Sequence, residues 1–195
     1  NISFEYYQPA SVKEEAIISI SHINYGYKVF DNSYSKSTTQ ASTGFNTSGG
    51  CQVNINCAEG NNWQIEKHAI ARVIAKTPQG SFWCSGALIN NTNNDRTLYF
   101  LTAHHCLKGL DAVNNPDASQ WIFYWEYENP ACERILTEPI QKSTVGATIV
   151  ANNSTTDFAL LRLIQSPTNL KGVAPYFLGW DRTNNPSTGG AGIHH

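Results

Sequence analysis

Charge is scarce in this sequence and carries no pattern. Only 14% of the 195 residues are charged, and 13 Lys and Arg against 15 Asp and Glu give a formal net charge of −2. No cluster of basic residues occurs along the chain. Nucleic acids and anionic membrane surfaces attract proteins through such clusters, so we expect neither as a partner.

Long apolar runs and methionine are also missing. The apolar runs extend over a handful of residues, whereas a membrane-spanning helix needs roughly 18 or more. We therefore expect a soluble chain with no membrane partner. No methionine occurs anywhere, no signal peptide is visible, and the first residue is Asn1. These features predict that the N-terminus is processed or that the chain is a fragment of a longer reading frame.

Helical periodicity is the third feature that is scarce. Apolar residues rarely recur every 3.6 residues, while β-branched and aromatic residues are plentiful and are separated by Asn, Ser, Thr and Gly. Apolar runs between such turn residues indicate strands, so the sequence predicts an all-β fold. Five cysteines favour an oxidising, secreted setting, and their odd number leaves one of them without an internal partner.

Composition divides the chain near residue 48. Residues 31–50 are rich in Ser, Thr, Asn and Gly, a composition that cannot bury a core and is typical of a linker. Two β-like runs, 2–7 and 16–23, precede it. We expect residues 1–48 to be a propeptide-like or accessory β segment that ends in this linker, and the sequence leaves open which of the two it is.

A hairpin is the clearest local element of the remainder. Residues 69–75 and 81–89 predict two strands that turn at Pro78-Gln79-Gly80. The second strand contains the small residues Ser85-Gly86-Ala87, which would allow another backbone to approach closely.

Three more strands are expected downstream. Residues 121–127 form an aromatic run that should supply core on both faces; an aromatic stripe could also stack on carbohydrate or bases, but core packing is the favoured interpretation. Residues 145–151 and 155–163 predict the other two.

The most informative stretch is residues 99–106, Tyr-Phe-Leu-Thr-Ala-His-His-Cys, an apolar strand that ends at two histidines and a cysteine. It resembles the Thr-Ala-x-His-Cys signature of chymotrypsin/trypsin-like serine proteases. Together with residues 84–92, Cys-Ser-Gly-Ala-Leu-Ile-Asn-Asn-Thr, it is still more similar to the lysyl endopeptidase branch. The resemblance implies that residues 49–175 form the six-stranded Greek-key first barrel of the chymotrypsin fold and that residues 176–195 begin a second barrel.

The resemblance also implies two site residues. His105, directly before the cysteine, would be the general base, and Asp157 would orient it, because Asp157 opens a segment similar to the family's aspartate-containing strand. The two residues follow the His, Asp, Ser order of this class. Successive residues of a strand point to opposite faces, so only one of the neighbours His104 and His105 can meet Asp157. The resemblance selects His105 and leaves the role of His104 open.

The same resemblance implies how the cysteines pair. Cys84 and Cys106 would connect the histidine turn to the hairpin, and Cys57 would pair with Cys132. Cys51 would pair with a cysteine downstream of this sequence.

No Gly-Asp-Ser-Gly-type nucleophile segment occurs in the sequence. We therefore interpret the chain as the N-terminal part of a secreted serine endopeptidase that hydrolyses peptide bonds by a His-Asp-Ser triad, with the serine outside it. The chain alone should be inactive. We expect a protein or peptide substrate, a monomer and no cofactor. The resemblance implies cleavage after lysine, but in the family the residues that select lysine lie in the other half.

Two other interpretations stay open at this point. A non-catalytic binding module could have kept the barrel and lost the nucleophile. A metal-binding β protein could use His104, His105, Cys106, His194 and His195. The metal interpretation is disfavoured, because neighbouring side chains on a strand diverge and helical His-Glu-x-x-His spacing is absent.

Overall fold

The computed structural model describes residues 11, 45, 48–133, 135, 137–183, 185 and 187–195. The chain separates into two compact units, residues 1–38 and residues 39–195. In the first unit only Ser11, in a turn, is described. The strands expected at 2–7 and 16–23 and most of the linker at 31–50 therefore lie outside the described residues, and the domain boundaries stay predictions.

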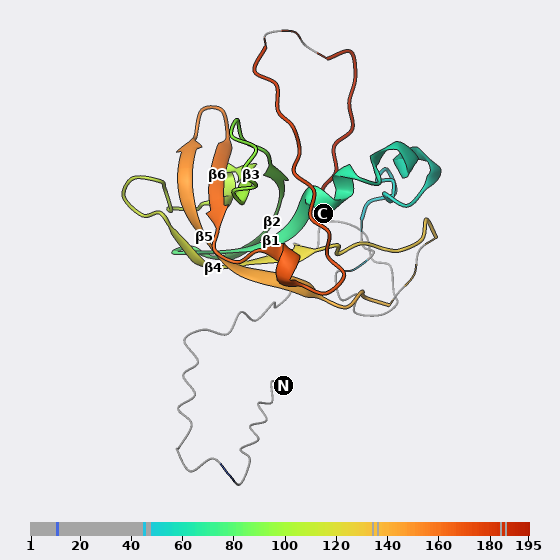
Figure 1. Cartoon of the computed structure of the whole chain (residues 1–195), viewed down its shortest axis with the longest axis horizontal. Coiled ribbons are helices and arrows are strands. Elements are labelled where there is room, and N and C mark those ends of the chain that lie inside the picture. Colours follow the sequence, from blue (N-terminus) through green and yellow to red (C-terminus); the bar gives the residue numbers. More distant parts are fainter. Residues whose placement is uncertain are drawn as a thin grey trace, which may run out of the picture. The chain divides into compact units, whose positions relative to one another are not determined.

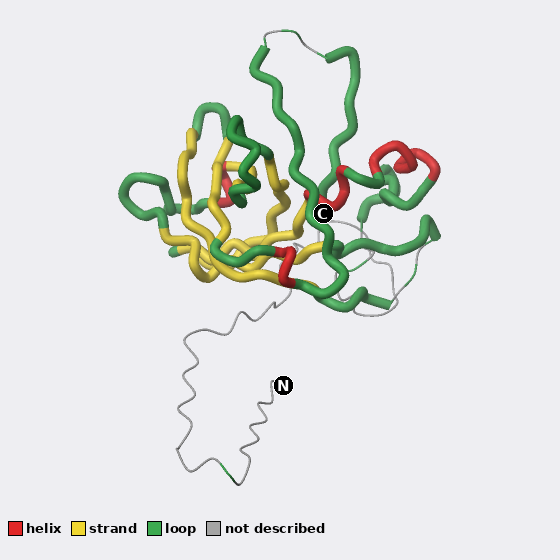
Figure 2. Tube along the Cα trace, in the orientation of Figure 1, coloured by secondary structure: helices red, strands yellow, loops and turns green. Residues whose placement is uncertain are grey.

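The second unit contains a closed antiparallel barrel in the strand order β1-β2-β3-β6-β5-β4. Its strands are β1 (Ile70–Thr77), β2 (Gly80–Ile89), β3 (Tyr99–Ala103), β4 (Asp117–Trp125), β5 (Lys142–Asn153) and β6 (Phe158–Leu163). Figures 1 and 2 show these strands curving around a common interior, with helical residues confined to short turns. The prediction of an all-β, six-stranded barrel is confirmed.

Four short 3₁₀ turns complete the described secondary structure: η1 (Ala58–Trp63), η2 (Glu66–Ala69), η3 (His104–Cys106) and η4 (Pro167–Asn169). Within the described residues, no helix is long and apolar enough to cross a membrane.

The predicted hairpin is present, and its turn has a local cause. Gly80 has φ of +126°, a conformation that residues with a Cβ rarely adopt. The hydroxyl of Thr77 accepts a hydrogen bond from the backbone N–H of Gln79 at 3.1 Å and donates to the carbonyl of Gly80 at 3.1 Å. Thr77, the last residue of β1, pairs with Gly80, the first residue of β2, so the turn fixes the register of both strands.

Aromatic residues of β4 supply much of the core. Trp121, Phe123 and Trp125 are buried, whereas the alternate residues Ile122 and Tyr124 are only partly buried. The expectation of core on both faces was therefore wrong, because one face of a strand in a closed barrel points outward. Core packing itself is confirmed: the Phe100 ring packs edge-on against Phe123, with centroids 5.0 Å apart.

Two disulfides form as the resemblance implied. Cys84 bonds to Cys106 and Cys57 bonds to Cys132, while Cys51 is free and exposed. The Cys84–Cys106 bond closes a loop with a sequence separation of 22 residues. By chain-entropy arguments such a loop contributes about 3 kcal/mol to stability, and here it also ties the turn that carries the histidines to β2.

The segment that follows the barrel returns to β2. Leu178 exchanges backbone hydrogen bonds with this strand, donating to the carbonyl of Leu88 at 2.9 Å and accepting from Asn90 at 2.8 Å. Farther on, the Ser85 hydroxyl accepts a hydrogen bond from the backbone N–H of His195 at 2.9 Å. The C-terminal segment, red in Figure 1, therefore ends beside β2.

Replacing Gly86 tests the close backbone approach that the small residues Ser85-Gly86-Ala87 predicted. A Cβ at Gly86 would lie 2.3 Å from Cε1 of Phe100 and 2.5 Å from the carbonyl oxygen of Leu101. We expect Gly86→Ala to destabilise the fold by about 1–3 kcal/mol through overpacking, as measured by urea unfolding with tryptophan fluorescence. Gly179→Ala is the matched control, since no atom lies within 4 Å of its added Cβ. Equal unfolding midpoints for the two variants would contradict this packing.

Candidate active site

The histidines lie in a tight turn at the end of β3. The strand stops at Ala103, and His104, His105 and Cys106 form the 3₁₀ turn η3, closed by the N–H of Leu107 donating to the carbonyl of His104 at 2.9 Å. We expected the two histidines to lie on a strand, which is wrong, since they lie in a 3₁₀ turn. A 3₁₀ turn has about three residues per turn, so neighbouring rings diverge for that reason instead.

Asp157 lies at the end of the turn that joins β5 to β6. The strand predicted at 155–163 begins only at Phe158, so residues 155–157 belong to the turn. Asp157 has φ of +53°, a left-handed conformation that aspartate and asparagine tolerate better than most residues. Asn153 holds this turn, because its side-chain oxygen accepts the backbone N–H groups of Thr155 at 2.9 Å and Thr156 at 3.0 Å.

Strand pairing brings the two turns together. Ala103, the last residue of β3, lies opposite Phe158, the first residue of β6. The residues next to them in sequence, His104 and Asp157, are joined by a backbone hydrogen bond from the N–H of His104 to the carbonyl of Asp157 at 3.1 Å. The register of β3 and β6 therefore makes His105 and Asp157, the two predicted site residues, neighbours.

His105 uses both oxygens of the Asp157 carboxylate. The ring atom Nδ1 lies 2.8 Å from Oδ2, and the backbone N–H of His105 donates to Oδ1 at 2.9 Å. A carboxylate can only accept, so the proton of a neutral imidazole resides on Nδ1. The second ring nitrogen, Nε2, is then free to take a proton from another group.

Hydrogen bonding also sets the charge of the site. The pKa of Asp157 is lowered below its usual value of 3.8, mainly by the hydrogen bond from the His105 ring and next by the one from the His105 backbone N–H. The carboxylate is therefore ionised at neutral pH. The side chains of His105 and Asp157 are 66% and 51% exposed. The pair is therefore a geometric feature more than a source of stability, since exposed ion pairs contribute little.

His104 has a different partner. Its Nδ1 lies 3.2 Å from the amide nitrogen of Asn152 on β5, and the amide oxygen of Asn152 accepts the backbone N–H of Ala112 at 2.8 Å. Sequence reasoning missed Asn152, because an asparagine at the end of a predicted strand resembles an ordinary turn residue. No local pattern could have paired it with His104.

The residues considered for a metal site are not brought together. Cys106 is oxidised in the disulfide with Cys84, so it has no thiolate to offer. In the part of the chain that the structure describes, no three His, Cys, Asp or Glu side chains are grouped so as to hold a metal ion.

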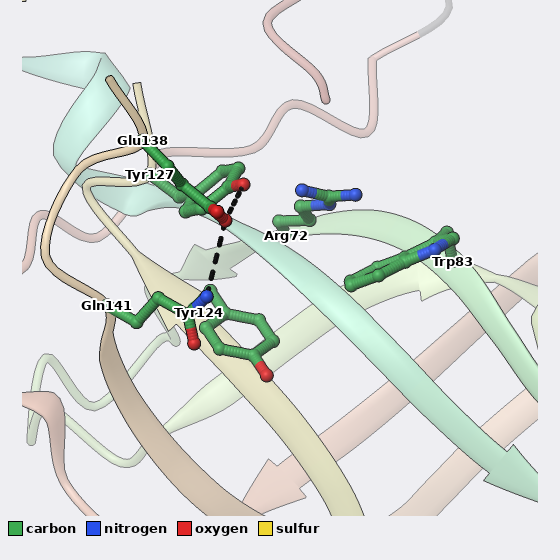
Figure 3. Close-up of a pocket in the computed structure, with 6 residues that line it drawn as sticks. All are labelled: Arg72, Trp83, Tyr124, Tyr127, Glu138 and Gln141. Atoms are coloured by element: carbon green, nitrogen blue, oxygen red, sulfur yellow. Dashed lines mark hydrogen bonds between the residues drawn. The ribbon is translucent and has the colours of Figure 1, made fainter. Parts of the chain in front are cut away.

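A second cluster of polar and aromatic side chains lies on the outer face of β1, β2 and β4. Figure 3 shows the residues that line it: Arg72, Trp83, Tyr124, Tyr127, Glu138 and Gln141. The Arg72 guanidinium stacks 3.7 Å above the Trp83 ring and 4.8 Å from the Tyr127 ring. Glu138 accepts hydrogen bonds from the hydroxyl of Tyr127 and, at 3.2 Å, from the amide of Gln141.

The side chains of this cluster pack closely against one another. Burial, together with the hydrogen bond to Glu138, raises the pKa of Tyr127 to about 12, so its hydroxyl stays protonated and donates at neutral pH. The space between the side chains is about 30 Å³, which has room for little more than water. The cluster holds the outer face of the barrel together through stacked rings and hydrogen bonds.

The fold and site together define a class. A closed six-stranded antiparallel barrel of this kind, with a histidine–aspartate pair at the ends of β3 and β6, is a chymotrypsin-like barrel. Residues 45–195 match the family model of the lysyl endopeptidase C-terminal domain, and the chain belongs to this family.

A curated relative supports the assignment. The chain is 27% identical over 163 residues to a lysyl endopeptidase of Pseudomonas aeruginosa, an alignment that covers 78% of this chain and 33% of the relative. The chain thus spans about a third of the length of this relative.

Lowering the pH should reveal how much the ionised carboxylate of Asp157 stabilises the fold. A carboxyl group whose pKa is lowered by folding stabilises the fold above its unfolded pKa, and this contribution is lost as the pH falls through the folded pKa. Below pH 4, therefore, the melting temperature of the wild-type chain should fall more steeply than that of Asp157→Asn, which cannot titrate there. Thermal unfolding measured between pH 2 and pH 7 checks this.

The variant His105→Ala is the comparison for this experiment. It removes the ring donor but keeps the backbone donor to Asp157, so its acid dependence should lie between those of the other two chains. Parallel curves for all three would show that the contacts of His105 do not lower the pKa of Asp157.

Proposed function

We propose that this chain is the histidine- and aspartate-bearing part of a secreted serine endopeptidase that hydrolyses peptide bonds. The observation that carries the proposal is the contact of His105 with both oxygens of Asp157, at 2.8 Å and 2.9 Å. Membership of the lysyl endopeptidase C-terminal domain family supports it. The nucleophilic serine is supplied by a part of the full-length protein outside these 195 residues.

Each residue has a defined role in this reaction. Nε2 of His105 accepts the proton of the serine hydroxyl as the oxygen attacks the peptide carbonyl, and later gives that proton to the leaving amine. Asp157 keeps the other ring proton on Nδ1 and stabilises the imidazolium that forms. The oxyanion is bound by backbone N–H groups that, like the serine, belong to the rest of the protein.

The surroundings support further parts of the proposal. Two disulfides suit a protein that acts in an oxidising, extracellular setting. The substrate is a protein or peptide, and we propose cleavage after lysine because the curated relative is a lysyl endopeptidase. The enzyme acts as a monomer without a cofactor. The 195-residue chain by itself is practically inactive, because loss of the nucleophile costs on the order of 10⁶-fold in such enzymes.

Kinetics of the full-length protein test the assignment of the base. We expect His105→Ala to lower kcat on a lysyl peptide substrate by at least about 10⁴-fold, because the base and its orienting contact are both lost. His104→Ala is the matched neighbour, and it should lose less than about 10²-fold, the scale of a positional defect. The reverse order of the two variants would assign the base to His104. Full turnover in both variants would show that neither histidine is the catalytic base.

A further inference from the structure

Two adjacent asparagines end β5 and serve the two halves of the site. Asn153 lies opposite Phe158, and its side chain holds the turn that presents Asp157. Asn152 lies opposite Ala159 and contacts the histidine turn instead. The contacts of Asn153 are local, within three residues of the sequence. The contacts of Asn152 are long-range, since its partners His104 and Ala112 lie 48 and 40 residues away in the sequence.

The hydrogen bonds of Asn152 determine which ring nitrogen of His104 is protonated. A backbone N–H can only donate, so the amide oxygen of Asn152 must be the atom that faces Ala112 at 2.8 Å. The amide nitrogen is then the atom that faces His104 at 3.2 Å, and it donates. Nδ1 of His104 therefore accepts, and the proton of its neutral ring is on Nε2, the opposite arrangement to His105.

The two bonds also close a loop. His104 begins the segment that leaves β3, and Ala112 lies where this segment approaches β4, with Lys108 and Gly109 in left-handed conformations between them. The segment is anchored inside by Leu107 and Leu110, which are 0% and 5% exposed. One asparagine side chain thus fastens both ends of the segment to β5.

We propose that Asn152 and His104 form a positioning pair that holds the histidine turn so that the ring of His105 faces Asp157. This inference rests on the proposed function and deepens it. Neither residue of the pair removes the proton of the nucleophile. Both carboxylate oxygens of Asp157 are taken by His105, whereas the ring of His104 contacts Asn152.

A direct test uses the 195-residue chain and needs no catalysis. The proton between Nδ1 of His105 and Asp157 should give a low-field signal in the proton NMR spectrum. We expect Asn152→Ala and His104→Ala each to broaden or remove this signal through faster exchange, and the double variant to do no more than either alone. His104→Asn should retain it, because an asparagine side-chain oxygen can accept at about the position of Nδ1.

The full-length protein supplies the second readout. We expect Asn152→Ala and His104→Ala to lower kcat by about tenfold, and by less than 10²-fold, with KM unchanged, because a misplaced base slows the chemical step and leaves ground-state binding intact. The double variant should lose no more than either single variant. His104→Asn should restore most of kcat.

A bridging amide elsewhere in the fold is the matched control. The amide of Asn56 donates to the carbonyl of Asn129 at 2.6 Å and its oxygen accepts from Lys67 at 2.9 Å. Asn56→Ala should lower the melting temperature without changing the low-field signal or kcat. A purely structural role for Asn152 would give the same pattern in Asn152→Ala.

Either of two outcomes would overturn the positioning pair: an unchanged low-field signal in Asn152→Ala, or effects of the two single variants that add in the double variant. The proposed function fails separately. If the full-length protein cleaves no peptide while the signal responds as expected, the pair positions His105 but the peptidase assignment is wrong.

Discussion

Ala103 of β3 and Phe158 of β6 lie opposite each other, and this register places the histidine turn beside the aspartate turn. The two strands are neighbours in the barrel although β4 and β5 separate them in the sequence. A slip of one residue would turn every side chain of a strand to the other face. The contact between His105 and Asp157 therefore depends on barrel closure, and barrel closure depends on the buried core.

The site and the core contribute differently to the stability of the fold. His105 and Asp157 are largely exposed, so their contact adds little to the stability of the fold. Stability comes from aromatic packing around Phe100, which is 0% exposed and whose ring lies against Gly86. The fold thus provides geometry for the site at the ends of strands, where a turn can vary without disturbing the interior. The Cys84–Cys106 disulfide and the side chain of Asn152 each connect the histidine turn to a different strand.

The sequence predicted the parts of the structure that have local signals. The hairpin followed from its Pro-Gln-Gly turn. The resemblance named the two residues that the structure brings together, His105 from residues 99–106 and Asp157 from the segment that it opens. The catalytic role of these two residues stays a prediction. Three features could not be predicted: the 3₁₀ turn at the histidines, the stacked guanidinium of Arg72, and the contact of Asn152 with His104, the last two of which arise between distant strands. A three-residue turn has no periodicity, and an asparagine carries no sign of its distant partner.

The central claim is that this barrel carries the base and its orienting carboxylate for a serine supplied elsewhere in the same protein. The most direct measurement is labelling of the full-length protein with a fluorophosphonate, followed by mass spectrometry of the labelled peptide. The account predicts one modified serine, located after His195, and no labelling of the 195-residue chain by itself. A label on a serine within residues 1–195, or an unlabelled full-length protein, would contradict it.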